Sequence, residues 1–174
     1  MIAGKIQKAF NDQIKEELES AYLYLSMVGY FHSTGLDGMA QWMRAQVQEE
    51  LAHAMKFFDF INERDGKVEL LPIPTDRQKE WASPLEVFQA SYAHEQHITG
   101  KINDLVKLAR DENDNAASIF LQWFVTEQVE EEANTSKVAQ MLERIGDSGH
   151  GIFMMDQKLG ERTTAAASTT DGQA

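Results

Sequence analysis

Four glutamates interrupt otherwise apolar patterns in this sequence. Residues seven apart return to one face of an α-helix after two turns, so seven-residue steps trace a single helix face. On four such faces every position is apolar or aromatic except one, and that exception is glutamate each time. The faces are Phe10, Glu17, Tyr24 and Phe31; Met43, Glu50 and Phe57; Phe88, Glu95, Ile102 and Ala109; and Phe124, Glu131, Val138 and Ile145.

These glutamates have the composition of a metal site. Each lies near the middle of its predicted helix, so all four would share one layer of a bundle. Buried carboxylates are costly without compensating positive charge, which two cations would supply. His53 follows Glu50 by three residues and shares its face, giving a Glu-x-x-His motif. Carboxylates with one imidazole favour iron or manganese over thiophilic metals. His94 adjoins Glu95 but projects about 100° away, so it is not a predicted ligand. The alternative is that the rotation assigned to each helix about its axis is wrong, so that these glutamates do not point into the core.

Five helical segments are predicted to position these side chains. Glycine follows three of them, at Gly35, Gly66 and Gly146. Asp37 can cap the second segment. Ser83, Pro84 and Glu86 supply an N-cap, a first-turn proline and a capping-box glutamate for the third. The helical period of the apolar residues places the segments at about 4–33, 38–64, 84–111, 115–145 and 148–160.

The connection over 65–83 sets the predicted topology. It contains Pro72 and Pro74, and ~19 extended residues can span about 60 Å. That exceeds the length of a 28-residue helix, about 42 Å, so the connection can return along the whole bundle. The fold class is therefore predicted to be all-α, a four-helix bundle with one long crossover and a short C-terminal fifth helix. Residues 1–162 are expected to form one domain, and 163–174 a disordered low-complexity tail.

Composition limits the partners and the compartment. A net charge of −12 argues against nucleic acid, whose phosphates need a basic face, and suits attraction of cations. The absence of cysteine excludes disulfides and thiolate metal sites. No stretch reaches the roughly 20 apolar residues of a membrane span, and the N-terminus has no apolar signal core. We therefore expect a cytoplasmic protein with no nucleic-acid or membrane partner.

Over about residues 5–162 the sequence resembles the ferritin family, in particular the non-haem ferritins of bacteria and archaea. The motifs that carry the resemblance are Asn-Asp-Gln-Ile at 11–14, Ser-Ala-Tyr-Leu-Tyr-Leu at 20–25, Gln-Glu-Glu-Leu-Ala-His-Ala at 48–54, Tyr-Ala-His-Glu at 92–95 and Trp-Phe-Val-Thr-Glu-Gln-Val-Glu-Glu-Glu at 123–132.

The resemblance implies a ferroxidase centre that holds two iron ions and oxidises Fe(II) to Fe(III) with O2 or peroxide. Tyr24 matches a tyrosine that hydrogen-bonds a ligand and donates an electron, although simple packing is the alternative. The implied ligands are Glu17, Glu50 and His53 for the first iron, with Glu50 bridging, and Glu95 and Glu131 for the second, with Gln128 beside it.

A third iron site is also implied by the resemblance, at Glu49, Glu127 and Glu130. The alternative is a solvated helix face. Leu51 stands where bacterioferritins place a haem-ligating methionine, so haem is not expected. The last long helix also lacks a second Glu-x-x-His, so the centre is asymmetric rather than of the bacterioferritin kind.

For assembly, the resemblance implies a homo-oligomer, a hollow shell of 24 subunits around an iron mineral, with residues 148–160 at the four-fold axes. Packing of this segment on its own bundle is the alternative. The acidic turn of Asp111, Glu112 and Asp114 could line an iron channel or be an ordinary solvated turn.

Three rival classes fit less well. A rubrerythrin-type oxidase needs a Cys-x-x-Cys site, and this chain has no cysteine. A DNA-binding mini-ferritin places its iron between subunits and lacks the carboxylates of the last long helix. A purely structural or signalling bundle would have an apolar layer where this one has four glutamates.

Overall fold

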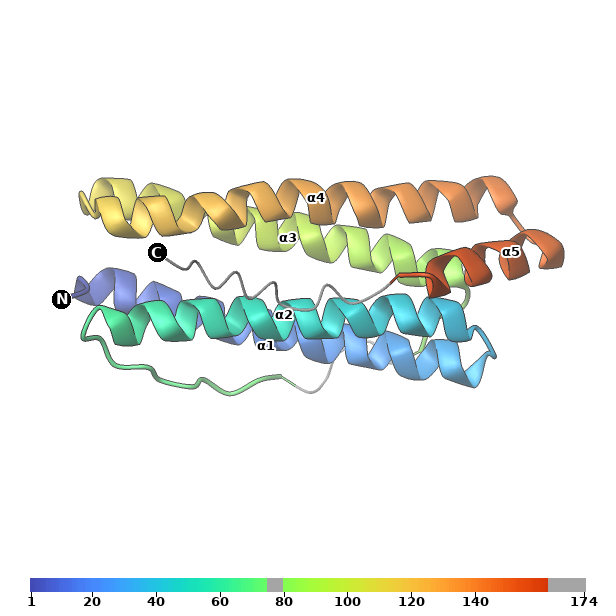
Figure 1. Ribbon diagram of the computed structural model, residues 1–174, viewed down its shortest axis with the longest axis horizontal. Coiled ribbons are helices and arrows are strands. Elements are labelled where there is room, and N and C mark those ends of the chain that lie inside the picture. Colours follow the sequence, from blue (N-terminus) through green and yellow to red (C-terminus); the bar gives the residue numbers. More distant parts are fainter. Residues whose placement is uncertain (75–79, 163–174) are drawn as a thin grey trace, which may run out of the picture.

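The computed structural model describes residues 1–74 and 80–162. Within these ranges the chain is helical and contains no strand, as predicted. Four long helices form a bundle in which α1 pairs with α2 and α3 with α4, and a short fifth helix lies at one end (Figure 1). The helices are α1 Gly4–Ser33, α2 Asp37–Glu63, α3 Pro84–Asp111, α4 Asn115–Ile145 and α5 Gly149–Gly160.

Local signals account for most of the helix ends. The Ser83 hydroxyl accepts a hydrogen bond from the Glu86 amide (3.2 Å), which confirms the predicted N-cap of α3. Gly35 and Gly146 have positive φ angles of 73° and 56°, which favours glycine after α1 and α4. After α2 the residue with positive φ is Asp65 (54°) rather than the neighbouring glycine.

The predicted cap of α2 is wrong. The helix begins at Asp37 itself, and the residue before it makes no side-chain cap. Asp156 of α5 takes that role, because its Oδ1 accepts a hydrogen bond from the Met39 amide (2.8 Å). Asp37 instead approaches His32, with 2.9 Å between its Oδ1 and the imidazole Nδ1.

Helix α5 packs on its own bundle, against the start of α2. A Cβ atom on Gly38 would lie only 1.9 Å from the carbonyl oxygen of Asp156, so the two backbones are in direct contact. Met155 and Leu159 are buried on the inner side of α5. Phe153, on the same helix, is 57% exposed within the subunit.

The apolar core consists of two clusters, one toward each end of the bundle. One contains Phe10, Phe57 and Phe124, and the other contains Phe31 and Phe88 among its aromatic members. The four glutamates belong to neither cluster, although their side chains are buried. The predicted inward faces are buried throughout except at the last position, Ile145, which is only partly buried.

The part of the crossover that follows α2, up to residue 74, runs along the bundle (Figure 1). The buried Asn11 of α1 fixes its first part: the Asn11 amide donates to the Lys67 carbonyl (3.1 Å), and the Glu69 amide donates to Asn11 Oδ1 (2.9 Å). The predicted disordered tail, 163–174, lies outside the described residues. None of the helices in the described ranges is long and apolar enough to cross a membrane.

Candidate metal centre

The predicted carboxylate layer exists. Its four glutamates come from α1, α2, α3 and α4, and each side chain is 3% exposed or less. His53 of α2 is 4% exposed. The residues of this layer are Glu17, Glu50, Glu95 and Glu131. Because burial of charge without compensation is so costly, this arrangement within a folded core is typical of a cation site.

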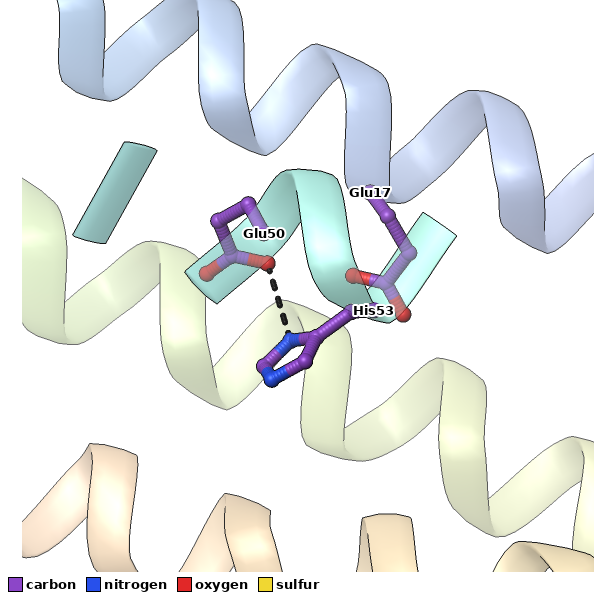
Figure 2. Close-up of side chains that lie close together, drawn as sticks. All are labelled: Glu17, Glu50 and His53. Atoms are coloured by element: carbon purple, nitrogen blue, oxygen red, sulfur yellow. Dashed lines mark hydrogen bonds and ion pairs between the residues drawn. The ribbon is translucent and has the colours of Figure 1, made fainter. Parts of the chain in front are cut away.

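One half of the layer has the geometry of a metal-binding triad. In Glu17, Glu50 and His53, one potential ligand atom of each residue lies within 4.8 Å of the other two (Figure 2). His53 Nδ1 lies 3.3 Å from Glu50 Oε2. The Glu17 side chain reaches this pair from the facing helix, so the triad joins α1 to α2.

One oxygen of Glu17 receives no hydrogen bond from an amide, hydroxyl or imidazole of the described residues. Its Oε1 accepts a hydrogen bond from the Gln13 amide (3.0 Å). Its Oε2 is buried, and the group close enough to share a proton with Glu17 is the carboxyl of Glu50, itself a carboxylate of the layer. A buried acceptor without a donor is uncommon in folded proteins, and beside two other ligand atoms it marks a position for a cation.

The other half of the layer is held by neutral donors. The Tyr24 hydroxyl donates to Glu95 Oε1, and the Gln128 amide donates to Glu95 Oε2 (3.2 Å). The Gln46 amide donates to Glu131 Oε2 (2.9 Å). The sequence interpretation missed Gln46, although its position four residues before Glu50 on the same face of α2 was an available signal.

Electrostatics raise the pKa values of all four glutamates in this layer. Burial, together with repulsion from Glu50, raises the pKa of Glu17 to about 8. Burial and repulsion from Glu95 raise the pKa of Glu131 to about 7. Burial and the neighbouring carboxylates also raise the pKa values of Glu50 and Glu95. Without cations, the layer therefore retains protons that ordinary carboxylates have lost at neutral pH.

The predicted third site is less compact. Among the described residues, the three carboxylates do not form a group as close as the first triad. Glu49 Oε2 pairs with Arg162 Nη2 at 2.7 Å. The pKa of Glu49 is raised, mainly by burial and in part by the nearby charge of Glu127. Glu130 is exposed. A third iron position on these residues stays a prediction.

His94 and His97, which lie outside the triad, have partners of their own. His94 Nε2 lies 2.7 Å from the Ser20 hydroxyl, which agrees with its exclusion as a ligand. His97 Nε2 lies 3.2 Å from Glu16 Oε2, a partner that the sequence pattern did not indicate. Trp123 of α4 makes a T-shaped ring contact with His53, with ring centroids 5.4 Å apart.

A four-helix bundle with one long crossover and a buried carboxylate–histidine layer defines the ferritin-like class of proteins. The family model of the ferritin-like domain matches residues 7–145. The chain therefore belongs to the ferritin family, and the resemblance seen in its motifs is confirmed.

Sequence relatives and solved structures agree with this assignment. The chain is 44% identical over 165 residues to a bacterial non-heme ferritin of Bacteroides fragilis, covering 93% of this chain and 100% of the relative. It is 38% identical to a bacterial non-heme ferritin of Campylobacter jejuni, covering 91% and 95% of the two chains. An open-pore ferritin from the archaeon Archaeoglobus fulgidus superposes with a TM-score of 0.92 at 47% identity, covering 94% of this chain and 100% of that one.

Proposed function

We propose that this chain is the subunit of an iron-storing shell and that its carboxylate layer oxidises Fe(II) with O2 or peroxide. The observation that carries the proposal is the layer itself. Four buried glutamates and one histidine meet in the core, two of the glutamates have a pKa raised to about 7 or 8, and one buried carboxylate oxygen lacks a donor. Bound cations would neutralise the buried carboxylates, replace the protons that they retain, and bond to the oxygen that lacks a donor.

The proposed division of ligands follows the geometry of the two halves. Glu17, Glu50 and His53 bind the first Fe(II) ion. Glu95 and Glu131 bind the second ion, with Glu50 as the bridge between the two positions. The proximity of Glu50 to both halves supports this role, because Glu95 and Glu131 both raise its pKa through charge repulsion.

The chemistry requires each Fe(II) substrate to lose one electron. With O2 as oxidant, two electrons and two protons convert one O2 molecule to hydrogen peroxide. With peroxide as oxidant, its O–O bond breaks, and two electrons and two protons give two water molecules. Hard, anionic carboxylate oxygens favour Fe(III) over Fe(II), so this ligand set promotes the oxidation.

Storage requires a cavity larger than one bundle can enclose, so the proposal includes a shell of 24 subunits. Family membership supports this, and so do apolar side chains left exposed on the single subunit. Leu25 on α1 is 51% exposed, and Phe153 and Met154 on α5 are 57% and 54% exposed. Contacts between subunits would cover such residues.

The test is rapid-mixing oxidation of Fe(II) by the assembled protein, followed by absorbance of the ferric product. Glu50→Ala and His53→Ala should abolish the fast phase. Glu143→Ala, which removes an exposed glutamate of α4, should leave it intact. Fast oxidation in the Glu50 and His53 variants would refute the assignment of the centre. Elution of the wild-type protein as a monomer or dimer in size exclusion would refute the storage shell.

A further inference from the structure

Arg162 lies just beyond the end of α5, at a place that the packing of this helix fixes. Its backbone amide donates to the Leu159 carbonyl (3.2 Å), which continues the last turn. Two contacts anchor α5 on α2: the hydrogen bond between Asp156 and Met39, and the close approach of Gly160 to Gly38, where an added Cβ would lie 3.0 Å from the Gly38 Cα. The Arg162 side chain therefore starts from a defined position beside α2.

The guanidinium of Arg162 makes three contacts along one face of α2. Its Cζ lies 4.5 Å from the centroid of the Trp42 ring. Nη1 donates to Gln46 Oε1, and Nη2 lies 2.7 Å from Glu49 Oε2. Positions 42, 46 and 49 follow helical spacing, so one planar group can stack on the first and bond to the other two.

The contact with Gln46 determines which way its amide points. Arginine offers only donors, so the Gln46 carbonyl oxygen must face Arg162, and the amide nitrogen must face the other way. That nitrogen donates to Glu131 Oε2 at 2.9 Å. A reversed amide would set donor against donor at Arg162 and oxygen against carboxylate at Glu131. Arg162 thus acts on a carboxylate of the metal layer through one intervening side chain.

We propose that Arg162 is a positioning residue of the metal centre with two linked effects. Through Gln46 it holds Glu131 ready for the second metal ion, and by pairing with Glu49 it supplies the positive charge at that carboxylate. A metal ion at Glu49 Oε2 must displace the guanidinium, and departure of the guanidinium also releases Gln46. Arg162, at the C-terminal end of α5, therefore couples the orientation of Glu131 to the ability of Glu49 to bind metal. The effect on iron chemistry rests on the function proposed above.

Two substitutions separate the two effects. Arg162→Lys keeps a positive charge near Glu49. It loses the planar group that hydrogen-bonds both Gln46 and Glu49 and stacks on Trp42. Arg162→Ala removes both the charge and the geometry. Lys158→Ala is the matched control, since Lys158 is an exposed cation on α5 itself.

The measurement is calorimetric titration of the assembled, metal-free protein with Zn²⁺, which needs no oxidation step. Loss of a side chain that orients a metal ligand commonly weakens binding by about 10- to 100-fold, and we expect roughly threefold to tenfold here because Arg162 acts through Gln46. Both Arg162 variants should weaken binding at the second position. Only Arg162→Ala should gain an additional Zn²⁺ event, and Glu49→Gln in the same chain should abolish that event.

A double-mutant cycle with Gln46→Ala tests the route. If Arg162 acts through Gln46, then Arg162→Ala should weaken Zn²⁺ binding at the second position no further in the Gln46→Ala background. An undiminished effect in that background, or unchanged binding in Arg162→Ala, would overturn the proposal. Failure of the wild-type protein to bind Zn²⁺ in the layer would instead count against the proposed function, so the two results are distinguishable.

Discussion

The hydroxyl of Tyr24 on α1 donates a hydrogen bond to Glu95 on α3, across the middle of the bundle. Tyr24 is fully buried, and burial together with the charge of Glu95 raises its pKa well above the ordinary value of a phenol. The phenol therefore keeps its proton at neutral pH and acts only as a donor to this carboxylate. This hydrogen bond fixes the position of the Glu95 carboxylate, a proposed ligand of the second iron. It does so independently of any redox role of Tyr24.

Removing that hydroxyl should lower both the stability of the fold and the affinity of the centre for metal. In Tyr24→Phe one buried oxygen of Glu95 loses its donor, which should cost about 1–3 kcal/mol in the free energy of unfolding. Zn²⁺ binding at the second position should weaken as well. Chemical denaturation and calorimetry would measure the two effects. Tyr92→Phe is the control, because its hydroxyl accepts a hydrogen bond from Gln96 one turn along α3, at an exposed position. Equal effects in the two variants would contradict a specific role for Tyr24.

Stability of the metal-free protein should fall as pH rises from about 5 to 8. The folded state keeps protons on Glu17 and Glu131, whose pKa values are about 8 and about 7, whereas the unfolded chain has lost them above about 4.5. Each retained proton contributes a slope of about 1.4 kcal/mol per pH unit within this window. Glu16 and Asp114 have lowered pKa values, so the stability that their charged forms contribute is lost only at more acidic pH.

Thermal denaturation at a series of pH values would measure this dependence. Glu17→Gln should flatten the slope, because the amide has no proton to lose, and should stabilise the metal-free protein at pH 8. A midpoint that rises between pH 5 and 8 in the wild-type protein would contradict the protonated layer.

Metal binding should release protons. At pH 6 both Glu17 and Glu131 are protonated in the folded protein, and a carboxylate must lose its proton to bind a cation. Zn²⁺ titrations in buffers of different ionisation enthalpy should therefore show proton release that is larger at pH 6 than at pH 9. Proton release that does not depend on pH would show that the carboxylates are already ionised.

The docking of α5 should depend on its hydrogen bond to the start of α2. Asp156→Ala removes a cap and should lower the free energy of unfolding by about 1 kcal/mol. Gly38→Ala should destabilise more, because its Cβ would lie 1.9 Å from the Asp156 carbonyl oxygen and α5 would have to move. Denaturation curves would rank the two variants against Asp147→Ala, an exposed aspartate just before α5. A ranking in which Gly38→Ala is harmless would contradict the contact.

The carboxylate layer was predictable from sequence because its glutamates lie on regular helices. Seven-residue spacing fixes a helix face without knowledge of neighbours, and the near-central position of each glutamate fixes its depth. Gln46 obeyed the same periodicity, but an amide among apolar residues carries a weaker signal than a carboxylate.

Other features depend on contacts that no local pattern contains. Asp37 has the residue type and position of a helix cap, yet Asp156, more than a hundred residues later, takes that role. Arg162 reaches Glu49 because α5 folds back on α2, and no local pattern favours this packing over a position between subunits. Ile145 continues the heptad of α4, but it lies at the end of the helix, where the bundle covers it only in part.

The hydrogen bond between Asp156 and Met39 has a consequence for the order of biosynthesis. A ribosome makes α2 long before it makes residue 156, so the growing chain holds a second helix whose first turn is not yet closed by its eventual partner. A residue made much later thus completes the first turn of an earlier helix. A chain cut short before α5 would lack this cap as well as the helix, and α2 acquires its cap only after residue 156 has been made.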